Sequence, residues 1–239
     1  MDKLCHNSLT TGAALTKAKI AKFKHNDFKH AEKVLKSSSY TGKLFIIIES
    51  VYSMDGDIGD LPAARRLADK YGGFIILDEA HGLGTVGKTG RGAEEHFNYQ
   101  VKADLICGSL TKSIGSQGGY IVCSKAIRTL LTFRANGSVF SAPISAFNCG
   151  AAIKSLDILE KEPERVAKLH ENAEYMREQF LKNGFDIGDA YTCVMPVIFK
   201  DVIQVLNMHK YILKKYGLFA STVTAPACPI NAPRFRITA

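Results

Sequence analysis

Short apolar runs alternate with amphipathic stretches along the first half of the chain. Buried strands are predicted at four apolar runs, 44–48 (LFIII), 74–77, 104–107 and 120–123. Between the first two runs, residues 61–71 (LPAARRLADKY) space their apolar side chains as one face of a helix does, with Pro62 in the first turn. A strand, a helix and a second strand in this order are typical of parallel sheets, so the pattern predicts a mainly parallel α/β layer with flanking helices.

The second half of the chain has longer helical patterns and fewer strands. Helices are predicted at 143–160 and 163–183, and Gly184 is a stop signal for the second of them. Strand-like pieces at 194–199 and 235–238 flank a further predicted helix at 202–216. This part of the chain is therefore expected to form a smaller α+β segment.

The change of pattern near residue 160 predicts two domains. Residues 1–160 would form the large domain and 161–239 the small one. The chain opens on a non-periodic segment (MDKLCHNS) and ends inside the last predicted strand (RFRITA) without a capping signal. We therefore expect the sequence to be part of a longer protein.

Composition and charge narrow the class of protein. The chain is 46% hydrophobic and 23% charged, and no apolar run approaches the ~18 residues of a membrane span. Six scattered cysteines without a CxxC pair or a zinc-like spacing predict a reduced, cytoplasmic protein that binds no metal. The net charge of +8 raises the possibility of nucleic-acid binding, but the lysines of the first 43 residues lack interleaved aromatic side chains. A solvated face or an anionic ligand such as coenzyme A explains the charge better, and no nucleic-acid partner is predicted.

The stretch LDEAHGLGTVGKTGRG, residues 77–92, matches the phosphate-binding pattern G-x-x-x-x-G-K-[ST]. Such a loop needs a helix that begins at the Lys-Thr pair, because the helix amides hold the phosphate. Here Gly90 and Gly92 follow Lys88 and Thr89, and glycine costs about 1 kcal/mol in a helix relative to alanine. We therefore predict a loop without a nucleotide site.

Polar side chains follow three of the predicted strands. Glu49 and Ser53 follow the first strand, Asp78 and His81 the second, and the segment 109–112 the third. The carboxyl ends of parallel strands meet at one edge of a sheet, where ligands bind. In GSLTKSIGSQGGY, small residues surround Lys112, and such a lysine can form a Schiff base with an aldehyde. A surface lysine in a loop is the alternative.

Three segments, ESVYSMDGDIGDLP, LDEAHGLGTVGKTGRG and DLICGSLTKSIGSQGGY, resemble in order and spacing the α-oxoamine synthases. These are pyridoxal-phosphate (PLP) enzymes of fold type I, among them serine palmitoyltransferase, 8-amino-7-oxononanoate synthase and glycine C-acetyltransferase. The resemblance covers essentially the whole chain. It implies a PLP-dependent acyltransferase that condenses an amino acid with an acyl-CoA thioester, with decarboxylation, to give an α-oxoamine, CoA and CO2.

The resemblance also implies roles for residues around the cofactor. Lys112 corresponds to the lysine that forms the Schiff base, and Asp78 to the carboxylate that faces the pyridine nitrogen. His81 and Ser53 correspond to groups that hydrogen-bond the phenolic oxygen of the ring. His6, in DKLCHNS, corresponds to the histidine that stacks on the pyridine face.

The remaining correspondences concern the phosphate and the substrate. Ser109 and Thr111 flank the lysine, and Ser109 corresponds to a hydroxyl that contacts the phosphate. Ser141, in SVFSAP, corresponds to a hydroxyl that reaches the phosphate of a partner subunit, which implies a homodimer with shared sites. Arg236 corresponds to the arginine that binds the amino-acid carboxylate. Arg234 lies on the same face of the predicted strand, so spacing does not choose between the two.

Two other functions stay open at this stage. The chain could be a cofactor-poor or non-catalytic partner subunit, because the family includes heterodimers in which one chain lacks the lysine. It could also have another fold type I activity, such as aldol cleavage or transamination, which needs no coenzyme A. The N-terminal segment of the family and its C-terminal end have no counterpart in this sequence.

Overall fold

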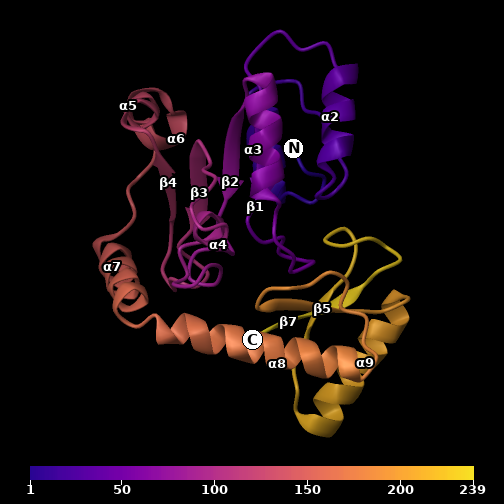
Figure 1. Ribbon diagram of the computed structural model, residues 1–239. Helices are drawn as coiled ribbons and strands as arrows, with labels where there is room; N and C mark the ends of the chain where they lie inside the picture. Colours follow the sequence, from indigo (N-terminus) through magenta and orange to yellow (C-terminus); the bar gives the residue numbers. More distant parts are fainter. The chain divides into compact units, whose positions relative to one another are not determined.

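The computed structural model describes residues 1–239 and divides them into two compact units (Figure 1). The first unit comprises Met1–Val51 and Gly59–Val166, and the second comprises Tyr52–Ile58 and Ala167–Ala239. The sequence predicted a boundary after residue 160, whereas the units divide after Val166. The short segment Tyr52–Ile58, which the sequence assigned to the large domain, packs with the second unit.

A four-stranded sheet organises the first unit. Its strands are β1 (Phe45–Glu49), β2 (Phe74–Asp78), β3 (Leu105–Ser109) and β4 (Gly119–Cys123), in the order β1-β2-β3-β4. β1, β2 and β3 are parallel, which confirms the mainly parallel sheet, and β4 is antiparallel to β3. The segment between β3 and β4 contains no helix and is too short for the crossover that parallel neighbours need.

Two helices lie side by side over one face of this sheet, α2 (Phe28–Ser37) and α3 (Leu61–Tyr71) (Figure 1). α3 has the bounds that its apolar spacing predicts. The Asp60 carboxylate accepts a hydrogen bond from the Ala63 amide at 2.8 Å, and Gly72 ends the helix in the left-handed conformation. The apolar side chains of α3 pack on Ile48 and Ile75 of the sheet and form the core of the unit.

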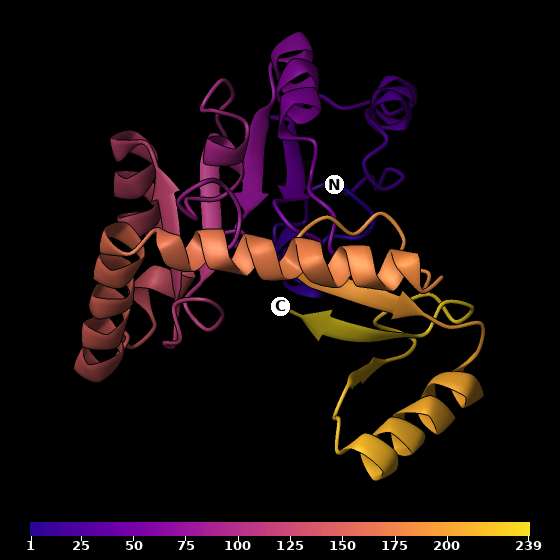
Figure 2. The same cartoon turned by 60° about the horizontal axis from the view of Figure 1, so that its bottom comes forward.

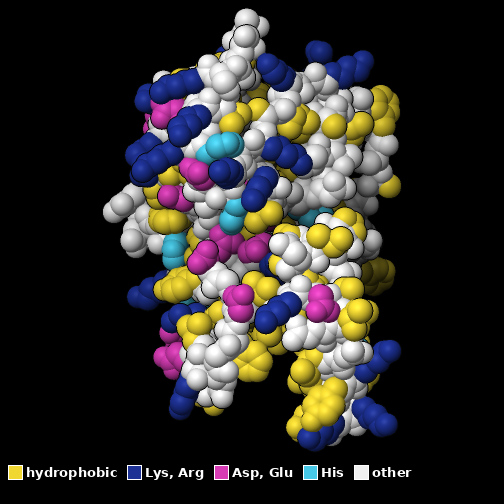
Figure 3. All heavy atoms as spheres, turned by 90° about the vertical axis from the view of Figure 1, so that its right-hand side faces the viewer, with side chains coloured by type: hydrophobic (Ala, Val, Ile, Leu, Met, Phe, Trp, Pro, Cys, Tyr) yellow, Lys and Arg dark blue, Asp and Glu magenta, His cyan; other side chains and the backbone are white.

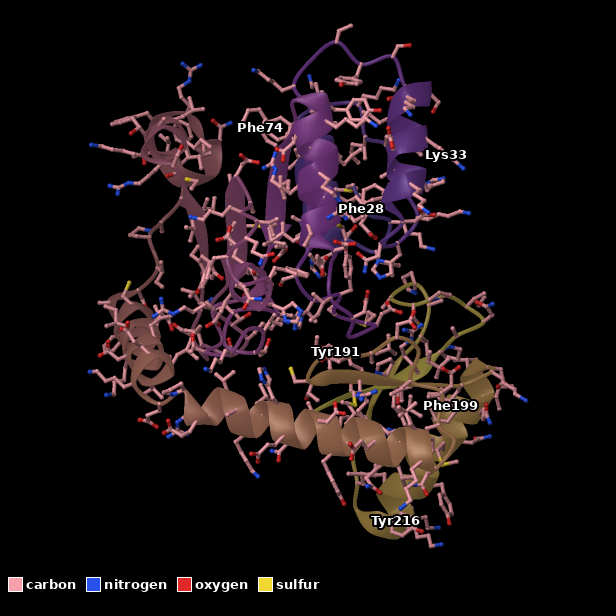
Figure 4. All side chains as sticks on the ribbon, viewed as in Figure 1. Phe28, Lys33, Phe74, Tyr191, Phe199 and Tyr216 are labelled. Atoms are coloured by element: carbon pink, nitrogen blue, oxygen red, sulfur yellow. The ribbon has the colours of Figure 1, made fainter.

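The helix α2 is strongly amphipathic. Phe28 points towards α3, whereas Lys33 points away from it (Figure 4). Figure 3 shows the side of the molecule that carries α2, where basic side chains are interspersed with hydrophobic and acidic ones. The Glu32 carboxylate lies 3.0 Å from the Lys36 ammonium and 2.8 Å from that of Lys70. These lysines therefore belong to a solvated face with exposed ion pairs.

The remaining helices of the first unit are α1 (Asn7–Leu15), α4 (Ala93–His96), α5 (Lys125–Arg134), α6 (Asn136–Val139) and α7 (Ala146–Lys161). α7 corresponds to the helix predicted at 143–160, and the other four were not predicted individually. No helix of the protein combines the length and the apolar character that a membrane crossing requires.

The second unit is a three-stranded antiparallel sheet with two long helices. β5 (Val194–Ile198), β6 (Ser221–Val223) and β7 (Arg234–Thr238) pair in the order β5-β7-β6, and the helices are α8 (Glu164–Lys182) and α9 (Val202–Tyr216). Figure 2 shows α8 running along the sheet. Phe199 and Phe235 meet edge to face, with ring centroids 4.8 Å apart, in the core that Val205 of α9 completes. The sequence did not predict β6.

The segment Tyr52–Ile58 is anchored to the second unit through Gly56. The Gly56 carbonyl accepts hydrogen bonds from the amides of Tyr191 and Thr192, both at 3.0 Å, and from the Thr192 hydroxyl at 2.8 Å. Gly56 has a φ of +71°, and a Cβ atom there would lie 1.9 Å from the Val194 carbonyl oxygen. Only glycine allows this close approach of two backbone segments.

Candidate active site

The carboxyl ends of the parallel strands bring several polar residues to one edge of the first unit's sheet. In the register of β1 and β2, Glu49 lies directly opposite Asp78, and Asp78 lies opposite Cys107 of β3. Ser109 ends β3 at the same edge, two residues beyond Cys107. The structure therefore brings together strand ends that the sequence predicted would meet.

Asp78 is half-buried and has little compensation for its charge. Its Oδ1 atom accepts a hydrogen bond from the Ala80 amide at 2.8 Å, and the carboxylate makes no ion pair with a lysine or arginine of the chain. Burial raises the pKa of Asp78, against the amide hydrogen bond and the nearby His6, which lower it. A cationic group placed against this carboxylate would be stabilised.

Glu49, which sequence reasoning left out of the predicted site residues, is a buried neighbour of Asp78. It is 4% exposed, and its Oε1 atom accepts a hydrogen bond from the backbone amide of His6. Burial raises the pKa of Glu49 to about 8, and the negative charges of Asp78 and Asp2 act in the same direction, whereas the His6 amide opposes them. Glu49 thus fixes the backbone of His6 beside Asp78. Its position at the end of the first predicted strand was the feature of the sequence that could have identified it.

His6 itself is exposed and caps the first helix. Its Nδ1 atom accepts a hydrogen bond from the Ser8 amide at 3.3 Å and lies 2.8 Å from the Ser8 hydroxyl oxygen. The imidazole is therefore held by α1 at one end while Glu49 holds its backbone. This places an aromatic ring at the polar edge of the sheet.

Glu79 follows Asp78 and has a different role. It is 3% exposed, and its Oε1 atom accepts a hydrogen bond from the Ala93 amide at 2.7 Å. Burial raises the pKa of Glu79 to about 7. Gly92 has a φ of +90°, and a Cβ atom there would lie 2.5 Å from the Glu79 Oε1 atom. Glu79 therefore fastens the glycine-rich loop to the end of β2.

The glycine-rich loop between β2 and α4 has no phosphate-binding geometry. No helix begins at Lys88 and Thr89, as the sequence predicted, and α4 begins only at Ala93. The amides of Thr89 and Arg91 both donate to the Glu95 Oε2 atom at 3.0 Å. A carboxylate of the chain itself therefore occupies the amides that a nucleotide phosphate would need. His81, half-buried, opens this loop, and its carbonyl accepts a hydrogen bond from the Thr85 hydroxyl.

Lys112 lies in a tight loop between β3 and β4. The Leu110 amide donates to the Gly118 carbonyl at 3.0 Å, and the Ser116 amide donates to the Leu110 carbonyl at 2.8 Å. The hydroxyl oxygens of Ser109 and Thr111 lie 2.7 Å apart, immediately before the lysine. The Lys112 side chain is exposed. The loop therefore presents an amine and two hydroxyls next to the end of β3.

Ser141 is not brought to this edge by any contact within the chain. It is exposed beyond α6, and its hydroxyl donates to the Gly137 carbonyl. Ser53 and Arg236, the other two predicted site residues, belong to the second unit.

The two candidate arginines of β7 differ sharply in their environment. Arg234 is 3% exposed and forms an ion pair with Asp55, with 2.9 Å between Nη1 and Oδ1. Arg236 is half-buried, forms no ion pair, and donates only its Nε group, to the Ser53 carbonyl at 2.6 Å. Burial lowers the pKa of Arg236. The Nη1 and Nη2 groups of Arg236 remain for an anionic ligand, which favours Arg236 over Arg234 as the carboxylate-binding residue.

Comparison with known proteins gives one consistent family. The family model described as aminotransferase class I and II matches residues 1–239. The 8-amino-7-oxononanoate synthase of Thermosipho melanesiensis is 36% identical over 236 residues, which is 99% of this chain and 60% of that protein. The serine palmitoyltransferase of Bacteroides thetaiotaomicron is 36% identical over 223 residues, which is 93% of this chain and 56% of that protein.

A solved structure is similar over the whole chain. It is a serine palmitoyltransferase variant from S. paucimobilis with a bound adduct of PLP and myriocin, 26% identical, with a TM-score of 0.93 over 100% of this chain and 60% of that one. The chain therefore spans about 60% of the length of these relatives. The resemblance inferred from sequence motifs, and the fold class that it implied, are confirmed.

We predict that Glu49→Gln removes a pH-dependent loss of stability. Because the pKa of Glu49 is raised from 4.5 to about 8, the folded chain binds the proton more tightly than the unfolded chain. Stability from this group is complete below the unfolded pKa and is lost as the pH rises towards the folded one. Glutamine keeps an oxygen for the His6 amide but does not titrate. The free energy of unfolding of the variant, relative to that of the wild type, should therefore rise by roughly 1–3 kcal/mol from about pH 5 to about pH 8.

Urea denaturation of both proteins at the two pH values measures this difference. Glu94→Gln, at a carboxyl on the short helix α4, serves as a control that should show no such relative gain. If the free energy of unfolding changed with pH in the same way in the wild type and in Glu49→Gln, the raised pKa of Glu49 would be contradicted.

Proposed function

The chain belongs to the aminotransferase class I and II family, and from this premise we propose that it is an α-oxoamine synthase, a PLP-dependent acyltransferase. The proposed reaction condenses an amino acid with an acyl-CoA thioester, with decarboxylation, to give an α-oxoamine, CoA and CO2. The observation that carries the proposal is the half-buried Asp78 carboxylate without a cationic partner, at the sheet edge where a neighbouring strand leads into the Lys112 loop.

The chemistry of the residues present fits pyridoxal 5'-phosphate. Asp78 suits a protonated ring nitrogen, because burial makes its uncompensated charge costly. Lys112 offers a primary amine to the aldehyde, and His6 offers an aromatic ring to the pyridine face. His81 and Ser53 would supply hydrogen bonds to the phenolic oxygen, as the family resemblance implies. When bound, the cofactor supplies an electron sink for the substrate α-carbon.

Hydroxyl groups and an arginine complete the proposed site. Ser109 and Thr111 lie in contact with each other next to Lys112 and suit the cofactor phosphate. Ser141, exposed beyond α6, suits the phosphate of a partner subunit, so the proposed assembly is a homodimer. Arg236 binds the substrate carboxylate through the two nitrogens that the chain leaves uncommitted.

Each of these residues then has its own role in the proposed reaction. Asp78 holds the proton on the ring nitrogen, and Arg236 fixes the amino acid by its carboxylate. His6 would cover one face of the ring when the cofactor is bound. A cytoplasmic location fits six free cysteines. The net charge of +8 suits a substrate as anionic as an acyl-CoA.

We predict that the protein releases CoA from an acyl-CoA only in the presence of PLP and an amino acid. A thiol-trapping assay with a set of acyl chain lengths and amino acids measures the release, and labelled CO2 from a carboxyl-labelled amino acid measures the decarboxylation. Turnover of amino acids without any acyl-CoA would indicate an aldolase or aminotransferase instead. Failure to retain the cofactor at all would indicate a non-catalytic partner chain.

We predict that Lys112→Ala removes the covalent link between chain and cofactor, because no other amine of the predicted site is placed to form it. Borohydride reduction followed by mass spectrometry should find the cofactor fixed to the wild type and not to the variant. Lys102→Ala, at an exposed lysine before β3, should be modified like the wild type. Modification that persists in Lys112→Ala would disprove the assignment of this lysine.

We predict that Asp78→Asn keeps the cofactor but slows loss of the substrate α-hydrogen by about a hundredfold or more. An amide does not hold a proton on the ring nitrogen, so electrons are withdrawn less strongly from the α-carbon. Exchange of the α-hydrogen with solvent deuterium, followed by NMR, measures the rate. Undiminished exchange in the variant would contradict the proposed role of Asp78.

A further inference from the structure

The ion pair between Asp55 and Arg234 fastens the segment Tyr52–Ile58 to β7. Arg234 is almost fully buried, and its Nη1 atom donates to the Asp55 carboxylate at 2.9 Å and to the Met54 carbonyl at 3.0 Å. Its Nε atom donates to the Ala232 carbonyl at 3.1 Å. Burial of a guanidinium is tolerated only where a carboxylate and hydrogen bonds compensate its charge. Arg234 is therefore committed to the scaffold.

The same segment sets the orientation of the neighbouring arginine. Arg236 lies two residues further along β7, and its Nε group donates to the Ser53 carbonyl at 2.6 Å. Ser53 directly precedes Met54 and Asp55, the two residues that Arg234 holds. The Ser53 carbonyl is thus fixed by the ion pair, and it fixes in turn the plane of the Arg236 guanidinium.

That plane matters for carboxylate binding. A guanidinium binds a carboxylate best when two N–H groups in its plane meet the two oxygens. With Nε committed to Ser53, the Nη1 and Nη2 groups are the pair that remains for a ligand. A rotation of the side chain, or a shift of the Ser53 carbonyl, would aim that pair away from its target.

Asp55 also prevents competition between the two arginines. Side chains two residues apart on a strand lie on the same face, about 6–7 Å apart. Without Asp55, Arg234 would be a buried cation that attracts any carboxylate near Arg236. Its neutralisation leaves Arg236 as the one arginine of β7 without an ion pair.

We propose that Asp55 and Arg234 are positioning residues: through the Ser53 carbonyl they aim the Arg236 guanidinium at the carboxylate of the amino-acid substrate. This inference rests on the proposed function, because it takes the substrate to be an amino acid. It assigns the segment Tyr52–Ile58 a role in substrate affinity in addition to its hydrogen bonds with Tyr191 and Thr192.

The test compares Asp55→Asn with the wild type, both saturated with PLP. The dissociation constant of the amino acid is read from the change in cofactor absorbance across a panel of amino acids. We expect Asp55→Asn to weaken amino-acid binding by about tenfold or more, because a buried charge loses its partner. The affinity for PLP, to which Ser53 contributes only one of several proposed contacts, should fall clearly less than the affinity for the amino acid. Asp55→Glu, which keeps the charge, should recover part of the loss.

Glu174→Gln is the matched control. It removes an ion pair with Arg177 on α8, at 2.6 Å, in the same unit but on its surface. Amino-acid affinity should be unchanged in this variant. Amide hydrogen exchange gives a second readout, and residues 52–58 should exchange faster in Asp55→Asn than in Glu174→Gln.

The outcomes separate this inference from the proposed function. Amino-acid binding by the wild type with an equal affinity in Asp55→Asn would overturn the inference alone. A parallel loss of PLP and amino-acid affinity would also overturn it, because it would indicate a general structural defect. Failure of the PLP-loaded wild type to bind any amino acid would overturn the proposed function and the inference together.

Discussion

The register of β1 and β2 places a buried carboxyl, Glu49, beside a half-buried one, Asp78, and much of the first unit's chemistry depends on this pairing. Glu49 and Asp78 are directly opposite each other at the end of the sheet. Two adjacent negative charges removed from water repel each other, so one of them keeps its proton or a cation approaches. Burial, with the Asp78 charge acting in the same direction, raises the pKa of Glu49 to about 8, and burial also raises the pKa of Asp78. In the proposed function, a cationic ring nitrogen would lie against Asp78.

At the end of β2, two consecutive carboxylates have different roles. Asp78 is the last residue of β2 and Glu79 directly follows it, and the two side chains have different partners, the amides of Ala80 and Ala93. Glu79 is directed into the glycine-rich loop and accepts the Ala93 amide, whereas Asp78 stays at the edge of the sheet. In the motif DEAH, Glu79 therefore shapes the loop that begins at His81, and Asp78 is the residue that the proposed function assigns to the ligand. Its likeness to a nucleotide-binding signature comes from glycines that serve this packing.

Sequence patterns predicted the elements that bury a continuous apolar face. The bounds of α3 and α9 agree with the prediction, and the strands of the parallel sheet differ from it by one or two residues. β6, with three residues, is too short to give a periodic pattern. β4 is antiparallel to β3 because the connection between the two strands is short. The choice between Arg234 and Arg236 was out of reach, because it depends on Asp55, far away in the sequence. The polar strand ends, in contrast, could be predicted from the residues that follow the apolar runs, and the motif resemblance then suggested a role for each.

Both units obey one electrostatic rule. Charges that find a partner within the chain are structural: Arg234 pairs with Asp55, and Glu95 receives the amides of the glycine-rich loop. Asp78 and Arg236 are partly removed from water and form no ion pair within the chain, and in the proposed function a ligand compensates their charges. One requires a cation and the other an anion, and Lys112 adds an amine suited to an aldehyde. In the proposed function, a cofactor with a protonated ring nitrogen and an aldehyde meets the requirements of Asp78 and Lys112 in the first unit, and a substrate carboxylate meets that of Arg236 in the second. For this reason the uncompensated charges, more than the fold alone, support the assignment of function.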